Sequence, residues 1–302
     1  MAFPKKIDLH MHTMISDGTD TPSEILKCVE DAGIELFSIT DHDSIKSSFV
    51  MRGILDDRAG EAKEAGGTGA AKGASPIYIP GIEFSCKDEE GKYHILGFGY
   101  DNNAEAINKV VDKGHTYRMT KARARVDGLK AQFGIELPED EVDALLKLDN
   151  PGKPHIGNLL VKHGYSETMP QAIKDYLNPI RCRSEYVRPE EAIEGILQSG
   201  GIPILAHPCY GSGDQLILGE EMDQRLRRLM DYGLKGLEAY YSGFTAKLRD
   251  QMLALADKYD LYVTAGSDYH GHNKMIEIGD NGLDDANTAA PGLLRFLEDI
   301  GI

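Results

Sequence analysis

Short apolar runs rich in β-branched and aromatic residues alternate along most of the chain with segments whose apolar residues recur at helical spacing. Such runs are typical of buried strands, and the longer periodic segments are typical of amphipathic helices. The pattern predicts strands at residues 6–12, 35–43, 75–86, 93–100, 202–208, 236–242 and 261–271. It predicts helices at residues 21–33, 190–201, 224–233 and 246–260. This alternation favours a mostly parallel α/β sheet of the barrel kind.

The first of these helices has clear signals at both ends. Thr21 is a suitable N-cap, Pro22 fits the first helical position, and Glu24 falls where a capping box needs an acidic residue. Gly33 is expected to end the helix, because glycine readily adopts the left-handed conformation that follows many helices.

Two segments interrupt the alternation. Residues 56–75 are small and glycine-rich, which predicts a short helix followed by a flexible loop. Residues 102–183 have a helical pattern throughout, so we expect an all-α insertion there. The expected organisation is an α/β barrel formed by residues 1–101 and 184–302, with an inserted helical subdomain at residues 102–183 that can cover a substrate.

The composition limits the class of partner. The formal net charge is −16, and so acidic a surface repels long nucleic acids, which require a basic binding face. A small phosphorylated substrate stays open, because bound cations can reverse the charge of a local site. No apolar run approaches the roughly 18 residues of a membrane span. The chain has no apolar secretory signal and its four cysteines form no Cys-x-x-Cys pair, so we expect a cytoplasmic protein without a membrane partner. We expect it to be a monomer or a small homo-oligomer.

Histidines and carboxylates recur near the ends of the predicted strands. His10 and His12 are two residues apart in the first strand, so their side chains share one face. In parallel α/β barrels the strand ends converge on one active site. The side chains expected to gather there are His10, His12, Asp17, His42, Glu83, His94, His207, Asp268 and His270. So many nitrogen and oxygen ligands exceed the needs of one metal ion and favour a site for two or three.

Each of these features has a simpler explanation when it is taken alone. A His-x-His pair in a strand is more often a packing or surface pair, and a single histidine such as His94 is more often a core residue. Asp17 followed by Gly18 is most simply a turn. Their joint recurrence at successive strands favours the metal site.

Five motifs, in order, resemble the signatures of the PHP (polymerase and histidinol phosphatase) superfamily. They are DLHMHTMISDGT, ITDHD, GIEFS, ILAHP and SDYH, which begin at residues 8, 39, 81, 204 and 267. The segment GKPHIGNLLVKHGY is similar to an Arg-Pro-His-Ile-Ala motif in the insertion of the small-nucleotide phosphoesterase branch, with Lys153 in place of the usual arginine. The resemblance implies a distorted (β/α)7 TIM-like barrel and a site for two or three divalent ions, Mn²⁺, Fe²⁺ or Zn²⁺.

The resemblance also implies how the ligands divide among three ions. One ion would be held by His10, His12, Glu83 and Asp268, a second by Glu83, His94 and His207, and the third by Asp17, His42 and His270. The expected catalytic residues are Asp17, Glu83, Asp43 and His207. Asp43 would either protonate the leaving group or, like Asp8 and Asp41, accept the second N–H of a ligating imidazole.

Contacts to substrate phosphates would come from the insertion. The candidates are Arg118, Arg125, Lys153 and His155, although a solvated helix face also explains the two arginines. The implied function is hydrolysis of a phosphate monoester of a small nucleotide, such as a nucleoside 3′,5′-bisphosphate or a short oligonucleotide end, by a metal-bridging hydroxide. The alternatives are a histidinol-phosphatase-like phosphomonoesterase and a non-catalytic PHP interaction domain.

Overall fold

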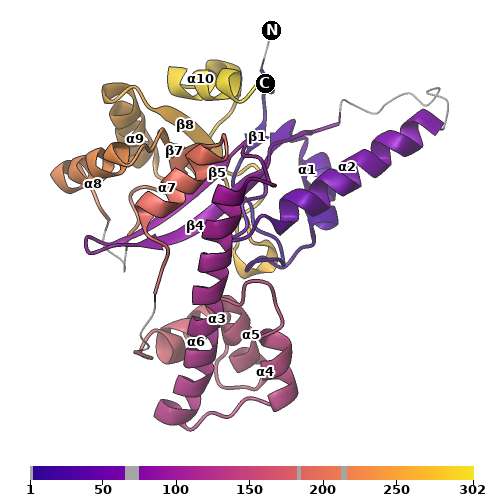
Figure 1. The fold of residues 1–302 in the computed structure, drawn as a ribbon, viewed down its shortest axis with the longest axis vertical. Coiled ribbons are helices and arrows are strands. Elements are labelled where there is room, and N and C mark those ends of the chain that lie inside the picture. Colours follow the sequence, from indigo (N-terminus) through magenta and orange to yellow (C-terminus); the bar gives the residue numbers. More distant parts are fainter. Residues whose placement is uncertain (1–2, 65–74, 182–184, 212–215) are drawn as a thin grey trace.

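The structure, a computed structural model, describes residues 3–64, 75–181, 185–211 and 216–302. Its strands form two sheets (Figure 1). The smaller sheet has three short parallel strands, β1 (Ile7–Asp8), β2 (Leu36–Phe37) and β3 (Ile77–Tyr78). The larger sheet has the order β4 (Gly81–Lys87), β5 (Lys92–Phe98), β6 (Ile202–Leu205), β7 (Gly236–Tyr241) and β8 (Tyr262–Gly266). Every predicted strand segment therefore contains a strand, although most are shorter than expected.

The described residues form a mixed α/β fold, as expected, but the two sheets do not close into one barrel. Isolated parallel bridges join them along two seams, between Met11 and Tyr269 and between His42 and Glu83. The strands of the smaller sheet are short, and the chain after β1 bonds to β8, where the Leu9 N–H donates to the Ala265 carbonyl at 2.9 Å. The side chain of Asp8, the last residue of β1, accepts hydrogen bonds from the Ser267 and Gly279 N–H groups, at 2.9 and 2.7 Å.

Strand β5 runs against both of its neighbours in the larger sheet. Its beginning therefore lies beside the carboxyl end of β6, where Ile95 pairs with Leu205. This direction brings His94, near the start of β5, to the same edge of the sheet as His207, which follows β6. His94 at the beginning of an antiparallel strand therefore lies beside His207, which follows the end of a neighbouring strand.

Helices pack against both sheets (Figure 1). Beside the smaller sheet lie α1 (Pro22–Ala32) and α2 (Lys46–Glu64), and around the larger sheet lie α7 (Pro189–Gln198), α8 (Gly219–Asp231), α9 (Ala246–Lys258) and α10 (Pro291–Asp299). Short turns of helix occur at Gly271–Asn273 (η2) and Ala286–Thr288 (η3). The sequence pattern did not predict α10 or the first half of α2.

The ends of α1 are confirmed in detail. The Thr21 side chain accepts a hydrogen bond from the Glu24 N–H, the Glu24 side chain bonds back to Thr21, and Gly33 has φ = 66°. The short helix expected from residue 56 is the second half of α2. The loop expected after it, at residues 65–74, lies outside the described residues.

The predicted helical insertion contains α3 (Glu105–Phe133), α4 (Glu139–Leu145), α5 (Lys153–Lys162), α6 (Met169–Ala172) and the π-helical turn η1 (Ile173–Leu177). Figure 1 shows α3 running from the sheets into this group, with α4, α5 and α6 gathered around its far half. Val110, in the first half of α3, packs in the core of the larger sheet. Leu129, in its second half, packs in a separate core with Leu145 and Leu160. Helix α3 thus holds the insertion against the sheets.

Candidate metal centre

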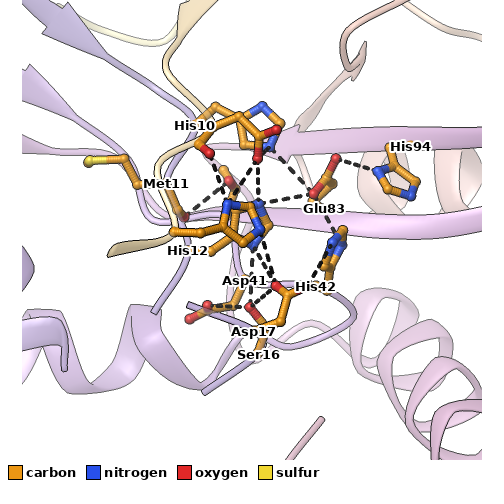
Figure 2. Close-up of polar contacts among 12 residues, drawn as sticks. His10, Met11, His12, Ser16, Asp17, Asp41, His42, Glu83 and His94 are labelled. Carbon is orange, nitrogen blue, oxygen red and sulfur yellow. Dashed lines mark hydrogen bonds and ion pairs between the residues drawn. The ribbon is translucent and has the colours of Figure 1, made fainter. Parts of the chain in front are cut away.

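The structure brings all nine predicted ligands together, and the Glu83 carboxylate lies at their centre (Figure 2). Its Oε1 atom lies 2.8 Å from His94 Nδ1 and 3.1 Å from His207 Nε2. Its Oε2 atom lies 3.1 Å from His12 Nε2, 3.1 Å from His42 Nδ1 and 3.4 Å from His10 Nε2. One carboxylate therefore faces five imidazoles, which suits the bridging role expected of it.

Two aspartates complete the cluster on either side of His270. Asp17 Oδ1 lies 3.3 Å from His270 Nε2, and Asp17 Oδ2 lies 3.9 Å from His42 Nε2. Asp268 Oδ1 lies 3.4 Å from His270 Nδ1, 3.4 Å from His12 Nε2 and 3.6 Å from His10 Nε2. These separations are compatible with ions bound between the side chains, because metal–ligand bonds are only about 2.0–2.3 Å long.

The hydrogen bonding of the imidazole rings also indicates that these side chains can bind divalent metal ions. Within the part of the chain that the structure describes, four buried ring nitrogens make no hydrogen bond, namely His10 Nε2, His12 Nε2, His94 Nδ1 and His207 Nδ1. Buried polar atoms are rarely left without a partner unless an ion or water satisfies them. Ligand atoms also lie within 4.8 Å of one another in three groups: His12, Asp17, His42 and His270; His10, His12 and Glu83; and His42, Glu83 and His94. His12 and His42 each belong to two groups, whereas the expected division assigned each of these histidines to a single ion.

The backbone is strained where it places several of these side chains. Among the described residues other than glycine, only Asp43, His207, Asp260 and Asp268 have positive φ, at 50°, 27°, 52° and 58°. Three of these four lie in or beside the cluster. Because such conformations cost free energy for residues with a Cβ atom, they persist where the surrounding structure holds them.

The imidazoles and carboxylates shift each other's ionisation strongly. Burial lowers the pKa of His12, but the nearby carboxylates of Asp268 and Glu83 outweigh burial and raise it to about 9. Burial raises the pKa of Glu83, yet nearby His94 and His42 bring it well below its usual range. Asp17 is likewise held well below its usual pKa by His42 and His270, against the effect of burial. A cation bound to His12 would therefore displace a proton, which makes metal affinity depend on pH.

Of the three aspartates expected behind the ligands, Asp41 is linked to a ligating ring through a single hydroxyl group. Asp41 accepts a hydrogen bond from the Ser16 hydroxyl at 2.7 Å, and that hydroxyl lies 3.3 Å from His12 Nδ1 (Figure 2). Asp8 instead fixes backbone N–H groups, including that of His10 at 3.3 Å. Asp43 accepts from the Ser85 N–H at 2.9 Å and pairs with Arg118 Nε at 2.5 Å.

Three residues that sequence reasoning missed support the cluster. Glu238 on β7 is fully buried, lies 3.0 Å from His10 Nδ1 and accepts a hydrogen bond from the His207 N–H at 2.8 Å. Tyr241 and Lys274 both donate to Asp268 Oδ2, at 3.0 and 2.5 Å. A carboxylate inside the apolar run GLEAYY was the one sequence signal that indicated Glu238.

A cavity of about 520 Å³ opens over the cluster. Its floor includes Asp17, His42, Glu83, His94, His207, Asp268 and His270. One wall carries Tyr210 and Tyr241, and the insertion contributes Pro154, Met169, Pro170 and Ile173. The insertion thus reaches the cavity through apolar side chains.

The four side chains expected to grip phosphate lie outside the lining of this cavity. Arg118 pairs with Asp43 and donates to the Ser85 hydroxyl at 2.8 Å. Lys153 donates to Asn178 at 2.5 Å, and His155 accepts from the Gly152 N–H at 3.0 Å. Arg125 is half-buried on the insertion side of α3. Their part in substrate binding stays a prediction.

Comparisons with known proteins agree with this chemistry. A family model described as the PHP domain matches residues 8–187. A 5′-3′ exoribonuclease of Haemophilus influenzae is 28% identical over 97% of this chain and 99% of its own length. A 3′,5′-nucleoside bisphosphate phosphatase of Chromobacterium violaceum is 28% identical over 87% of each chain. The structure of a protein from Bifidobacterium adolescentis described as a metal-dependent phosphoesterase is 26% identical, with a TM-score of 0.78 over 100% of this chain and 98% of its own.

The described part of the chain contains no helix that is both long and apolar enough to cross a membrane.

Proposed function

The chain belongs to the PHP domain family and is a metal-dependent phosphoesterase, and from this premise we propose that it hydrolyses a phosphate monoester of a small nucleotide. A nucleoside 3′,5′-bisphosphate or the end of a short oligonucleotide is the proposed substrate. The observation that carries the proposal is the cavity, which combines a floor of imidazoles and carboxylates with aromatic and apolar walls.

The walls favour a nucleotide over a smaller phosphate ester. Tyr210 and Tyr241 lie on one side with ring centroids 6.0 Å apart, and Met169, Pro170 and Ile173 come from the insertion. A planar base gains free energy by stacking on aromatic and apolar side chains. A volume of about 520 Å³ falls within the range usual for small-molecule sites, roughly 300–1,000 Å³.

We propose that the centre holds three divalent ions, Mn²⁺, Fe²⁺ or Zn²⁺. One would be bound by His10, His12, Glu83 and Asp268, a second by Glu83, His94 and His207, and a third by Asp17, His42 and His270. Bound cations of this kind lower the pKa of water and neutralise developing charge on phosphoryl oxygens. The three close groups of ligand atoms support the number of ions. The contacts of Asp268 with His10 and His12, and those of Glu83 with His94 and His207, support the division of the ligands.

The protein's own groups orient this centre. Glu238 accepts from His10 Nδ1, which leaves His10 Nε2 free to bind a cation. Tyr241 and Lys274 hold one oxygen of Asp268 and thereby turn the other toward the imidazoles. For Asp43, the pairing with Arg118 and the Ser85 N–H supports a role in fixing the strand beneath His42 rather than proton donation.

We also propose that residues 102–183 form a cap over the substrate, because they have a hydrophobic core of their own and line the cavity. The two sheets would then represent a distorted (β/α)7 barrel, since parallel bridges join them at both seams.

The test compares turnover of a nucleoside 3′,5′-bisphosphate, histidinol phosphate and a nucleoside lacking phosphate, before and after chelation of metal. We expect the bisphosphate to be hydrolysed fastest and chelation to abolish turnover. Faster hydrolysis of histidinol phosphate would instead support the histidinol-phosphatase-like alternative. A chelated protein that keeps full activity would contradict the proposed chemistry.

A second candidate is removal of nucleotides from the 5′ end of RNA, which the Haemophilus influenzae relative favours because it spans nearly the whole chain. The net charge of −16 argues against a long polyanion. Comparing a 5′-phosphorylated trinucleotide with an RNA of about twenty nucleotides separates the two. We expect the short substrate to be preferred, and a preference for the long one would support the exoribonuclease.

A further inference from the structure

Lys274 is the one lysine or arginine among the described residues that line the cavity over the cluster. It follows η2, the turn after β8, and its side chain is 36% exposed. An anionic substrate that enters this cavity therefore meets a single ammonium group from the walls. The basic residues of the insertion that the structure describes do not line the cavity, and two of them, Arg118 and Lys153, donate to Asp43 and Asn178.

The ammonium of Lys274 lies directly beside the cluster. Its Nζ atom donates to Asp268 Oδ2 at 2.5 Å, while Asp268 Oδ1 faces His10, His12 and His270 at 3.4–3.6 Å. One carboxylate therefore separates the ammonium from the imidazoles. Because Lys274 also lines the cavity, its ammonium lies beside the space that a phosphoryl group bound over the cluster would occupy.

The ammonium has donor capacity to spare. A lysine offers three N–H donors, and the one hydrogen bond that the structure gives Lys274 Nζ within the described residues goes to Asp268. The remaining donors have no protein acceptor there, and the cavity lies on their open side. Phosphoryl oxygens are strong acceptors for such charged donors.

The segment that carries Lys274 is fixed in place. The His272 N–H donates to Thr19 Oγ1 at 3.0 Å, and Asn273 Nδ2 donates to the Asp17 carbonyl at 2.8 Å. Asn273 Oδ1 accepts from Asn158 of the insertion at 3.4 Å. Gly271 has φ = +63° and packs so closely on Thr19 that a Cβ atom would lie 1.9 Å from its hydroxyl oxygen. Contacts on both sides thus hold Lys274 ready for a ligand, which lowers the entropy lost on binding.

From these contacts we propose that Lys274 binds the phosphoryl group of the substrate, with its ammonium shared between Asp268 Oδ2 and a phosphoryl oxygen. This inference rests on the proposed phosphoesterase function. The sequence analysis expected the phosphate contacts to come from the insertion, whereas this proposal assigns one of them to the turn after β8.

The test replaces Lys274 by Met and by Gln, with Lys162→Met as the control. Lys162 also forms a lysine–carboxylate pair, with Glu141 at 2.8 Å, but is exposed on the insertion. The Gln variant can still donate to Asp268 but has no charge, and it serves alone if the Met variant does not fold. For each metal-loaded protein we would measure the inhibition constant of inorganic phosphate, the KM of p-nitrophenyl phosphate, and bound metal by elemental analysis.

We expect both constants to rise by about tenfold to a hundredfold in the Lys274 variants and to stay at wild-type values in the control. Metal content should be unchanged, because Tyr241 still donates to Asp268 Oδ2 in these variants. Unchanged constants in a folded Lys274 variant would overturn the inference. So would a parallel loss of metal and phosphate affinity, because Lys274 would then act only by orienting Asp268. If the wild-type protein neither binds phosphate nor hydrolyses the ester, the proposed function is wrong as well. If the wild-type protein does both and the Lys274 variants do so equally well, only the role of Lys274 is wrong.

Discussion

The carboxylate of Glu83 lies 3.1 Å from the Nε2 atom of His207, although 124 residues separate them in the chain. The pairing arises because Glu83 lies on β4 and His207 follows β6, with β5 between them in the sheet. Sheet order therefore places a central carboxylate within reach of imidazoles from distant segments.

Replacing Glu83 by Gln should remove bound metal and lower activity by at least about a hundredfold, since one carboxylate faces five imidazoles. Elemental analysis and turnover of p-nitrophenyl phosphate provide the measurement. Glu90→Gln is the control, because Glu90 is 68% exposed and pairs with Arg228 away from the cluster. A Glu83→Gln protein with a full complement of metal would show that the carboxylate does not bridge ions.

Replacing Glu238 by Gln should weaken metal affinity by roughly tenfold to a hundredfold, because it changes the partner that orients His10. Affinity would be measured by competition with a chelator, and kcat at saturating metal should change much less. Glu194→Gln, whose side chain is exposed on α7 and bonds to Gln198, should leave both unchanged. If the Glu238→Gln variant binds metal with wild-type affinity, Glu238 does not orient His10 for metal binding.

Replacing Tyr210 by Ala should raise the KM for a nucleoside bisphosphate by about fivefold to a hundredfold, since stacking contributes roughly 1–3 kcal/mol per base. Glycerol phosphate, which has no base, should be hydrolysed as by the wild type. Tyr210→Phe is the matched control, because it keeps the ring and removes only the hydrogen bond to the Gly243 carbonyl. Equal losses on both substrates would argue against a base on this wall.

Lys121 on α3 should make stability depend on pH. Burial, followed by the charge of Arg118, lowers its pKa to about 7 from the model-peptide value of 10.5. Between these values the unfolded chain binds more protons than the folded one, so the free energy of unfolding should rise as pH increases from 7 toward 10.5. The Tyr186 ring, 3.6 Å from the ammonium, opposes this effect by favouring the charged form.

Chemical denaturation of wild type and Lys121→Met at pH 7 and pH 9 measures this dependence. The gain in stability between the two pH values should be larger for the wild type. The control is Lys130→Met, because Lys130 is 68% exposed and pairs with Glu136. Equal gains in wild type and the Lys121 variant would mean that the ammonium stays charged in the folded protein.

The sequence allowed detailed prediction where the determining interactions are local. The capping box of α1 depends on Thr21 and Glu24, three residues apart, and the structure confirms it. The shared face of His10 and His12 follows from the two-residue period of extended chain, and their ring centroids lie 5.2 Å apart. The order of the motifs was sufficient to indicate the family.

Prediction was incomplete where the partner lies far away in the sequence. The sequence indicated the α/β class but not the division of the described strands into two sheets, which depends on pairing between distant segments. Glu238 looked like one acidic residue in an apolar strand until the packing of β7 against β8 placed it beside His10. Lys274 carried no motif, and only the fixed turn after β8 brings it to the cavity.

The sequence by itself thus determined which side chains are candidates for binding metal, which faces they share within a strand, and where helix α1 begins and ends. These properties follow from backbone periods and contacts between near neighbours. Only the tertiary structure decided which candidate ligands lie close together, which side chains contact them, and which lysine lines the cavity. Those relationships depend on sheet order and on side chains brought together from β4, β6, β7 and β8, and no spacing along the chain specifies them.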